Sequence, residues 1–383
     1  MRLIDVDVYQ LAEKLKNRKA VCFGAGGELK NFVNKYKHYH FEKRIICVLD
    51  NDKEKQKSNI CINDYYLKVM SIHDFCADYP KEEFLMLITC TDIVSVYEQL
   101  EKYDAFIDTE VCSTRYIMST TRETDEQHRT YPESFRLSDM PMIPKVIHYC
   151  WFGGKPIPEK NLLWMESWKK YCPDYEIVRW DESNYDVSQN KYMYQAYKAG
   201  KLGFVPDYAR LDIVYKYGGI YLDTDVELIS TMDELVYQPA FAGVDGSWRV
   251  SLGLGFGAVK GSPIMGELRE QYSELTFYDE YGDLNMIAAP ALQEKIFMQK
   301  GYQKNGEYQI VDGMTIYPEK ILSAKCNTTG RILPTSRTVA IHHFDGSWVD
   351  EEKRIKIKKI QSLFQKETGD NDGERCREND SEI

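Results

Sequence analysis

The residues best suited to chemistry form a short acidic motif, Asp223-Thr224-Asp225, directly after an apolar run. That run, residues 220–222, predicts a short buried strand. In an extended backbone residues i and i+2 point to the same side, so both carboxylates can face one cation. Hard divalent cations prefer such oxygen ligands, and we expect a metal site here. The Asp-x-Asp spacing alone does not identify a metal site, because it also occurs at Asp5/Asp7, Asp50/Asp52 and Asp370/Asp372.

Two more polar residues, Asp207 and Arg210, lie in the helix predicted just before this strand. Pro206 fits the first turn of a helix, where its missing N–H does no harm, and Gly218-Gly219 ends the helix. Residues i and i+3 share one helix face. There Asp207 could accept hydrogen bonds from sugar hydroxyls, and Arg210 could bind a sugar oxygen or a phosphate. Taken without context, however, the spacing fits a surface ion pair that complements the helix dipole better.

The elements that must position these residues have an α/β pattern in two parts. Residues 18–117 alternate apolar runs (20–23, 45–49 and 84–89) with helical segments. Strands without polar alternation, joined by helices, predict a parallel sheet covered on both faces. We therefore predict a small Rossmann-like parallel α/β domain over 1–118, a polar linker over 119–142, a second α/β domain over 143–365, and a disordered charged tail over 366–383.

The composition restricts the class of protein. A net charge of −11 leaves no basic excess to neutralise a nucleic acid, so no nucleic-acid partner is expected. The ten cysteines form no C-x-x-C pair, which argues against a zinc or redox motif. No signal peptide is evident, and the longest apolar stretch, residues 84–90, is shorter than the roughly 20 residues that span a bilayer. We expect a cytoplasmic protein, with at most a peripheral place at the inner membrane.

Residues 207–225 resemble the central signature of the DXD-containing sugar-binding glycosyltransferases. This group, glycosyltransferase family 32 and its relatives, includes yeast mannosyltransferases, bacterial capsular-polysaccharide enzymes and, distantly, the clostridial glucosylating toxins. Residues 143–154, 173–184 and 342–348 resemble further motifs of the family, in the same order. The resemblance covers residues from about 143 to 350 and implies a GT-A fold, in which one Rossmann-like sheet holds a nucleotide and a metal ion. The first 120 residues lie outside it.

The family implies a role for each matching residue. For the metal it implies Asp225 as a direct ligand, Asp223 as a contact to the ribose and the metal, and His343 as a less certain third ligand. His342 competes with His343, and either could be a buried structural histidine. The remaining implied residues would bind the nucleotide sugar: Trp151 by stacking on the base, Asn184 by holding the nucleotide, Asp207 and Arg210 by binding the sugar, Tyr221 beside the diphosphate or sugar, and Ser347 and Trp348 by closing over the diphosphate.

The implied reaction transfers a hexose with retention of configuration. Trp151 matches the uracil-stacking branch, so UDP-glucose or UDP-galactose is the expected donor. A saccharide or lipid-linked oligosaccharide is the expected acceptor, in capsular or surface polysaccharide synthesis. A divalent cation, Mn²⁺ or Mg²⁺, would stabilise the charge on the leaving diphosphate. One departure concerns the acceptor region, where residues 288–290 read Ala-Ala-Pro and many relatives have Thr-Gly-Pro.

The N-terminal domain keeps other functions open. Residues 24–27 are a weak echo of the dinucleotide-binding motif G-x-G-x-x-G, since position 29 is Leu29, although Asp50 lies where a ribose-binding acid belongs. The domain could bind a nucleotide, serve as a scaffold or form oligomers. The alternatives to a transferase are a nicotinamide-dependent sugar epimerase or dehydrogenase led by this domain, and a sugar-nucleotide-binding pseudoenzyme. The intact Asp207, Arg210, Asp223 and Asp225 argue against the pseudoenzyme.

Overall fold

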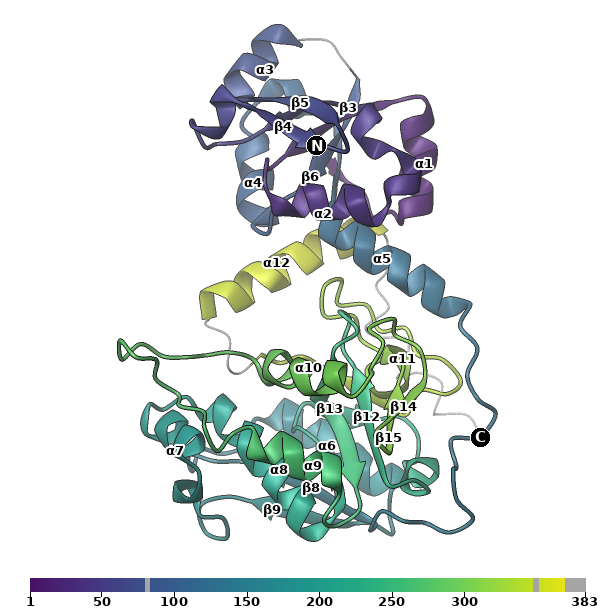
Figure 1. Cartoon of the computed structure of the whole chain (residues 1–383). Coiled ribbons are helices and arrows are strands. Elements are labelled where there is room, and N and C mark those ends of the chain that lie inside the picture. Colours follow the sequence, from purple (N-terminus) through teal and green to yellow (C-terminus); the bar gives the residue numbers. More distant parts are fainter. Residues whose placement is uncertain (80–82, 347–350, 369–383) are drawn as a thin grey trace. The chain divides into compact units, whose positions relative to one another are not determined.

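The computed structural model describes residues 1–79, 83–346 and 351–368, and the chain divides into two compact units (Figure 1). The first unit contains Met1–His128, Thr328–Gly330 and, among the described residues, helix α12 (Glu351–Thr368). The second contains Arg129–Asn327 and Arg331–Asp350. Within the described parts of the chain, each helix is too short or too polar to span a bilayer.

The first unit is built on a seven-stranded sheet in the order β1-β7-β6-β2-β3-β5-β4. All neighbouring strands are parallel except β4 and β5. Hydrophobic clusters form two separate cores of this unit, and helices surround the sheet (Figure 1). The predicted parallel α/β architecture is therefore confirmed. The strands are β1 (Arg2–Leu3), β2 (Lys19–Phe23), β3 (Ile45–Leu49), β4 (Asn59–Ile62), β5 (Tyr65–Met70), β6 (Phe84–Ile88) and β7 (Glu110–Ser113); the helices are α1 (Val8–Lys16), α2 (Gly27–Lys35), α3 (Ile72–Asp78), α4 (Ile93–Leu100), α5 (Thr114–Gln127) and α12 (Glu351–Thr368).

The borders of this unit differ from the predicted ones. The predicted linker over 119–142 begins with the second half of helix α5, whose buried residues include Thr121, Glu123 and Glu126. Such a polar buried face has no apolar periodicity to predict a helix. Helix α12 belongs to the first unit, where the ring of Phe364 stacks on Tyr116 with centroids 3.7 Å apart. Residues 369–383, most of the predicted disordered tail, lie outside the described residues.

The second unit carries a seven-stranded mixed sheet in the order β14-β15-β12-β13-β10-β8-β9. Strands β9, β8 and β10 are parallel, and β13 runs antiparallel to both β10 and β12. A separate two-stranded sheet pairs β11 with β16. This unit has the α/β architecture expected of a GT-A transferase domain. The strands are β8 (Val146–Cys150), β9 (Glu176–Trp180), β10 (Gly219–Tyr221), β11 (Val226–Leu228), β12 (Ala240–Val244), β13 (Val250–Ala258), β14 (Gln309–Val311), β15 (Met314–Tyr317) and β16 (Ala340–His342); the helices are α6 (Glu159–Tyr171), α7 (Lys191–Lys198), α8 (Val205–Tyr217), α9 (Pro263–Glu270), α10 (Ala289–Gln299) and α11 (Glu319–Leu322).

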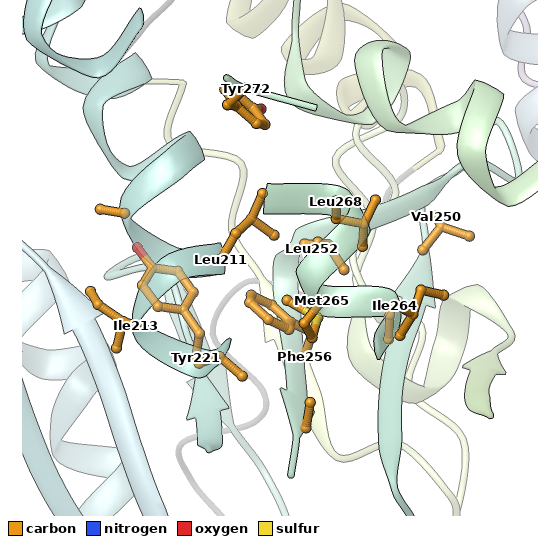
Figure 2. Packing of buried hydrophobic residues seen from close by; sticks show 14 of the residues in the cluster. Leu211, Ile213, Tyr221, Val250, Leu252, Phe256, Ile264, Met265, Leu268 and Tyr272 are labelled. Atoms are coloured by element: carbon orange, nitrogen blue, oxygen red, sulfur yellow. The ribbon is translucent and has the colours of Figure 1, made fainter. Parts of the chain in front are cut away.

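Packing of α8 and α9 against β13 forms one core of this unit (Figure 2). Leu211 of α8, Phe256 of β13 and Met265 of α9 are fully buried there. Burying one such side chain stabilises a fold by about 1.5–3 kcal/mol. Helix α8 is therefore held firmly on the sheet, and so are the polar residues in its first turns.

A double glycine joins helix α8 directly to strand β10. Gly218 and Gly219 have φ angles of +72° and +102°, in the region where glycine alone is unstrained. A Cβ on Gly218 would lie 2.9 Å from the backbone nitrogen of Lys260, and one on Gly219 would lie 2.8 Å from the carbonyl oxygen of Val146. This tight connection brings the start of α8 and the residues after β10 to one place.

Candidate active site

Asp223, Asp225 and His342 form the candidate metal centre. One ligand atom from each of the three lies within 4.8 Å of the others. The acidic motif leaves β10 and continues into β11, where the antiparallel partner β16 sets His342 opposite Val226. His342 Nε2 lies 3.3 Å from Asp225 Oδ1. Two carboxylates and an imidazole are a ligand set that suits a divalent metal ion such as Mn²⁺.

His343, the histidine first expected as the metal ligand, lies elsewhere. Its Nε2 is 2.8 Å from Glu227 Oε2, and its ring stacks on Trp164 with centroids 4.0 Å apart and an 8° angle between the planes. Successive side chains along an extended backbone point to opposite sides, so only one of two adjacent histidines can face the acidic motif. The structure brings the competing candidate, His342, to Asp223 and Asp225 in its place.

The electrostatics around Asp223 also favour a cation. Burial raises the pKa of Asp223, the nearby charge of Asp225 raises it further, and the Arg210 guanidinium opposes both effects. Arg210 Nη1 lies 3.3 Å from Asp223 Oδ2. A divalent ion between the two carboxylates would relieve their mutual repulsion. The residues present thus fit a metal site in burial as well as in donor type.

Asp207 and Arg210 form a buried pair beside this site, not a surface ion pair. They are 5% and 6% exposed, and the guanidinium hydrogen-bonds to the Asp207 carboxylate. Burial raises the pKa of Asp207 to about 6, although Arg210 opposes the shift. Arg210 thus bridges Asp207 to Asp223. A buried, partly compensated charge pair of this kind is typical of a binding site rather than of a solvated helix end.

A glycine on β13 makes room for this arrangement. A Cβ added to Gly253 would lie 2.8 Å from Asp223 Oδ2 and 3.2 Å from Arg210 Nη1. Any other residue at this position would push the carboxylate or the guanidinium away. The sequence analysis did not single out Gly253, because the strand that carries it is distant along the chain from the acidic motif.

Tyr221 ends strand β10, and Trp151 directly follows strand β8. Tyr221 is 1% exposed, and its ring centroid is 5.7 Å from the Arg210 guanidinium carbon. Trp151 directly follows β8, and its indole N–H donates to the carbonyl oxygen of Lys155, with 2.6 Å between nitrogen and oxygen. The indole ring is only half-buried. Trp151 therefore retains exposed ring surface on which a base can stack.

Asn184 has a structural task in the turn after β9. Its side-chain oxygen accepts from the backbone N–H of Asp181 at 2.9 Å, and its side-chain nitrogen donates to the carbonyl oxygen of Arg179 at 2.8 Å. The amide stabilises the turn in this way. A contact from Asn184 to a nucleotide would use the lone pair and the N–H that these two bonds leave over.

The segment leading to Ser347 and Trp348 begins at the metal centre. Ser347 and Trp348 themselves lie outside the described residues. Just before them, the backbone N–H of Asp345 donates to Asp225 Oδ2 at 2.9 Å, and the Asp345 carboxylate pairs with Lys160. The end of this segment is thus tied to a candidate metal ligand.

Helix α6 holds the acidic motif in place, and the sequence reasoning missed its part in the site. The Asn161 amide nitrogen lies 3.3 Å from both oxygens of Thr224, the Trp168 indole N–H donates to the Val226 carbonyl at 2.8 Å, and Ser167 Oγ accepts from the Leu228 N–H at 2.8 Å. One helix thus anchors the backbone from residue 224 to 228. The spacing of residues 161, 164 and 168 could have indicated a common contact surface, because these positions share one helix face.

Comparison with known proteins identifies the class of this region. Residues 158–242 match the family model described as "Glycosyltransferase sugar-binding region containing DXD motif". This part of the chain is therefore a DXD-type sugar-binding region, as the resemblance implied. It contains Asp207, Arg210, Asp223 and Asp225, whereas Trp151 and His342 lie outside the matched residues.

The chain is also similar to curated proteins of the fission yeast Schizosaccharomyces pombe. It is 38% identical to inositol phosphoceramide mannosyltransferase 3 over 110 residues, which are 26% of this chain and 29% of that protein. It is 31% identical to inositol phosphoceramide mannosyltransferase 2 over 111 residues, 27% of this chain and 31% of that protein. The chain thus spans under a third of the length of these relatives. Among solved structures, the PaToxG glycosyltransferase matches with 22% identity over 42% of this chain and 70% of its own, at a TM-score of 0.35, too low to bear on the fold.

Proposed function

We propose that this protein is a metal-dependent glycosyltransferase that moves a hexose from a nucleotide sugar to a saccharide acceptor. The observation that carries the proposal is the convergence of Asp223, Asp225 and His342 within 4.8 Å, beside the buried Asp207–Arg210 pair. A metal-binding group and a polyol-binding group side by side suit a diphosphate joined to a sugar. The match of residues 158–242 to a sugar-binding region supports the same function.

We assign the metal to Asp223, Asp225 and His342. A nitrogen ligand favours Mn²⁺ over Mg²⁺, which prefers an all-oxygen octahedral shell. The bound ion would stabilise negative charge on the diphosphate as the sugar leaves. Asp345 and Lys160 orient Asp225 through its second oxygen. Such support behind a ligand commonly affects metal affinity about 10–100-fold.

The reaction retains the configuration at the anomeric carbon in our proposal. The bond from the anomeric carbon to the diphosphate oxygen breaks, and the acceptor hydroxyl oxygen bonds to the same face of the sugar. The hydroxyl proton passes to the leaving diphosphate oxygen. Asp207 and Arg210 hold the sugar, and Arg210, which reaches Asp223, places positive charge close to where the diphosphate is released.

Our proposal for the donor and the acceptor rests on Trp151 and on the names of the yeast relatives. The half-exposed ring of Trp151 supports a uridine nucleotide, and UDP-glucose or UDP-galactose remains our proposal. The yeast relatives are named as mannosyltransferases, so mannose is the competing hexose. Their names also give a lipid, inositol phosphoceramide, as acceptor. We propose a saccharide or lipid-linked oligosaccharide acceptor here, in capsular or surface polysaccharide synthesis at the inner face of the membrane.

A cytoplasmic site of action is part of the same proposal. Cys22, Cys112, Cys150 and Cys172 are buried free thiols. Free thiols are what a reducing compartment maintains. Donor nucleotide sugars and a lipid-linked acceptor would meet the protein at that face of the membrane.

The direct test is release of nucleoside diphosphate from a panel of nucleotide sugars that includes UDP-glucose, UDP-galactose and GDP-mannose. With Mn²⁺, we expect slow hydrolysis of one donor, abolished by EDTA and by Asp225→Asn. Calorimetry with the nucleoside diphosphate and Mn²⁺ measures binding independently. Neither hydrolysis nor binding with any donor would refute the transferase proposal. An isolable covalent sugar–protein adduct would refute only the same-face mechanism.

A further inference from the structure

Four buried side chains around the sugar-binding pair carry polar atoms that have no hydrogen-bond partner. These atoms are the hydroxyls of Tyr192 and Tyr272, both amide atoms of Gln293, and Nε of Arg210. None of the four residues is more than 6% exposed. Leaving a buried donor or acceptor unpaired costs about 1–3 kcal/mol, and buried polar groups are seldom unpaired. Such a concentration in one place therefore requires an explanation.

The four side chains come from different elements: Arg210 bonds to Asp207, both tyrosines are influenced by the charge of Asp207, and Gln293 is a neighbour of Tyr272. Tyr192 lies on α7, Tyr272 follows α9, and their rings are 5.3 Å apart in an edge-to-face arrangement. Figure 2 shows Tyr272 at the edge of the hydrophobic cluster that contains Leu211. Besides burial, the charge of Asp207 raises the pKa of both tyrosines, which places their hydroxyls within its electrostatic reach.

Gln293 reaches this group from helix α10, which packs against strand β13. The Gln293 amide is a polar neighbour of the Tyr272 hydroxyl and lowers the pKa of that hydroxyl, but no hydrogen bond of acceptable geometry joins the two. The same strand carries Gly253, beside Asp223 and Arg210. Asp223, whose side chain is 29% exposed, is the open end of the group.

We propose that Gln293 and Tyr272, together with Tyr192, recognise the hydroxyl groups of the donor hexose and set the preference for that hexose. The inference rests on the proposed function. Each sugar hydroxyl both donates and accepts, as does a tyrosine hydroxyl. The Gln293 amide has one acceptor and two donor hydrogens, so it can bind two neighbouring hydroxyls at once. A bound hexose would thus satisfy the atoms that are unpaired in its absence.

The charges of the group define the kind of sugar. Asp207 and Arg210 compensate each other, and Gln293, Tyr192 and Tyr272 are neutral. Among the described residues, Arg210 is the cation beside Asp207, and it already pairs with Asp207 and Asp223. A carboxylate on the sugar would therefore be buried without a compensating charge, which is costly. The group therefore suits a neutral hexose, and a uronic acid would be excluded.

A purely structural polar cluster would behave differently, and that difference makes the inference testable. Removing a polar atom that has a partner destabilises a protein, whereas replacing an unpaired buried polar atom by an apolar one of the same shape is neutral or stabilising. Gln293→Met and Tyr272→Phe make such replacements with little change in volume. We therefore expect the ligand-free Tm of both variants to equal or exceed that of the parent protein.

The binding experiment compares a nucleoside diphosphate with its nucleotide sugar by calorimetry, in the presence of Mn²⁺ and with the full chain. In Gln293→Met and Tyr272→Phe we expect unchanged affinity for the nucleoside diphosphate and at least tenfold weaker affinity for the nucleotide sugar. We also expect the variants to discriminate less between donors that carry epimeric hexoses, because a pocket that hydrogen-bonds a hydroxyl discriminates by that bond. The control is Ser113→Ala, which removes another fully buried, unpartnered hydroxyl, in the first unit.

Each outcome has one meaning. If the parent protein binds a nucleotide sugar more tightly than the nucleoside diphosphate and both variants keep that gain, the role of Gln293 and Tyr272 is refuted and the transferase proposal stands. A lower ligand-free Tm with an equal loss of affinity for both ligands shows a structural role, which also overturns the inference. If the sugar contributes no affinity in the parent protein with any donor, this inference is refuted, whereas the proposed function fails only if the donors are neither bound nor hydrolysed.

Discussion

The two units each contain an Asp-x-Asp triplet after a buried strand. The pKa of the first aspartate is shifted in opposite directions in the two triplets. After β3, the Asp50 carboxylate accepts hydrogen bonds from the backbone N–H groups of Ala25 and Asp52, at 2.8 and 2.9 Å, and from the Lys55 amine at 3.2 Å. Although burial acts against them, these bonds lower the pKa of Asp50. After β10, the pKa of Asp223 is raised. Asp50 accepts three hydrogen bonds that favour its charge, whereas Asp223 shares the charge of Arg210 with Asp207.

The difference distinguishes an aspartate that stabilises a turn from one that is available to bind a ligand. The Asp50 carboxylate has two donors from its own loop and a third from Ala25 after β2, so it stabilises these two connections and has little capacity left for a ligand. The residues around Asp223 instead leave charge uncompensated and polar atoms unpaired, at a cost in stability that a ligand would offset. The comparison also weakens the alternative of a nicotinamide enzyme led by the first unit, because its ribose-binding candidate is Asp50.

The largest expected effect comes from neutralising one aspartate in each triplet. Asp223→Asn should reduce donor hydrolysis at least about 1,000-fold, because it removes a metal ligand and the partner of Arg210. Its ligand-free stability should be unchanged or higher, since one of two neighbouring, partly buried like charges is gone. Asp50→Asn should leave hydrolysis within about twofold and lower the free energy of unfolding by about 1–3 kcal/mol. Hydrolysis rates and chemical denaturation measure both, and equal losses of activity in the two variants would break the comparison.

A smaller effect separates the two adjacent histidines. His342→Ala should weaken Mn²⁺ binding at least about tenfold, because His342 lies at the acidic pair. His343→Ala should affect Mn²⁺ binding much less, since its ring contacts Trp164 and Glu227. Calorimetric titration with Mn²⁺ alone measures both. A stronger effect of His343→Ala would restore the assignment first expected from the sequence.

Much of the fold was predictable from local sequence, because buried strands and glycine breaks are short-range signals. The runs that become β2, β3 and β6 predicted the first sheet, and the segment from Pro206 to Asp225 predicted helix α8, its glycine end and strand β10. Helix α5 was missed because it buries Thr121, Glu123 and Glu126, which carry no apolar pattern. Our prediction placed residues up to 365 in the second domain, whereas helix α12 belongs to the first unit. Local sequence does not determine which unit such a terminal segment packs against.

The site residues that lie in one short segment could be predicted from the sequence, and those that distant segments contribute could not. Asp207, Arg210, Asp223 and Asp225 all lie within nineteen residues of sequence. The choice between His342 and His343 depends on the register of β16 against β11, which local sequence does not determine. Asn161, Gly253 and Gln293 reach the site from three further elements. None of them has a residue type that signals function by itself.

The smallest expected effect is a pH dependence of stability confined to the second unit. His148 is 3% exposed; its Nε2 lies 2.9 Å from the Gly218 carbonyl oxygen, and its Nδ1 accepts from the Trp180 indole N–H at 3.2 Å. These partners require a neutral imidazole with its proton on Nε2. Burial lowers the pKa of His148 below its usual value near 6.5, although the Gly218 carbonyl opposes the shift. The four histidines of the first unit, His38, His40, His73 and His128, are all exposed.

The sign of the effect follows from proton binding. Below about pH 6.5 the unfolded chain protonates this histidine while the folded unit resists, so stability is lost as the pH falls. One such group contributes at most about 1.4 kcal/mol per pH unit. Asp207, whose pKa is raised to about 6, acts in the opposite direction in the same pH range, in the parent and in the variant alike. We therefore expect acidification from pH 7 to pH 5 to be more destabilising for the second unit of the parent protein than for that of His148→Gln. Denaturation monitored by tryptophan fluorescence follows the second unit, because all six tryptophans lie at or beyond position 151. An identical pH slope in the parent and the variant would show that other groups control this unit's acid sensitivity.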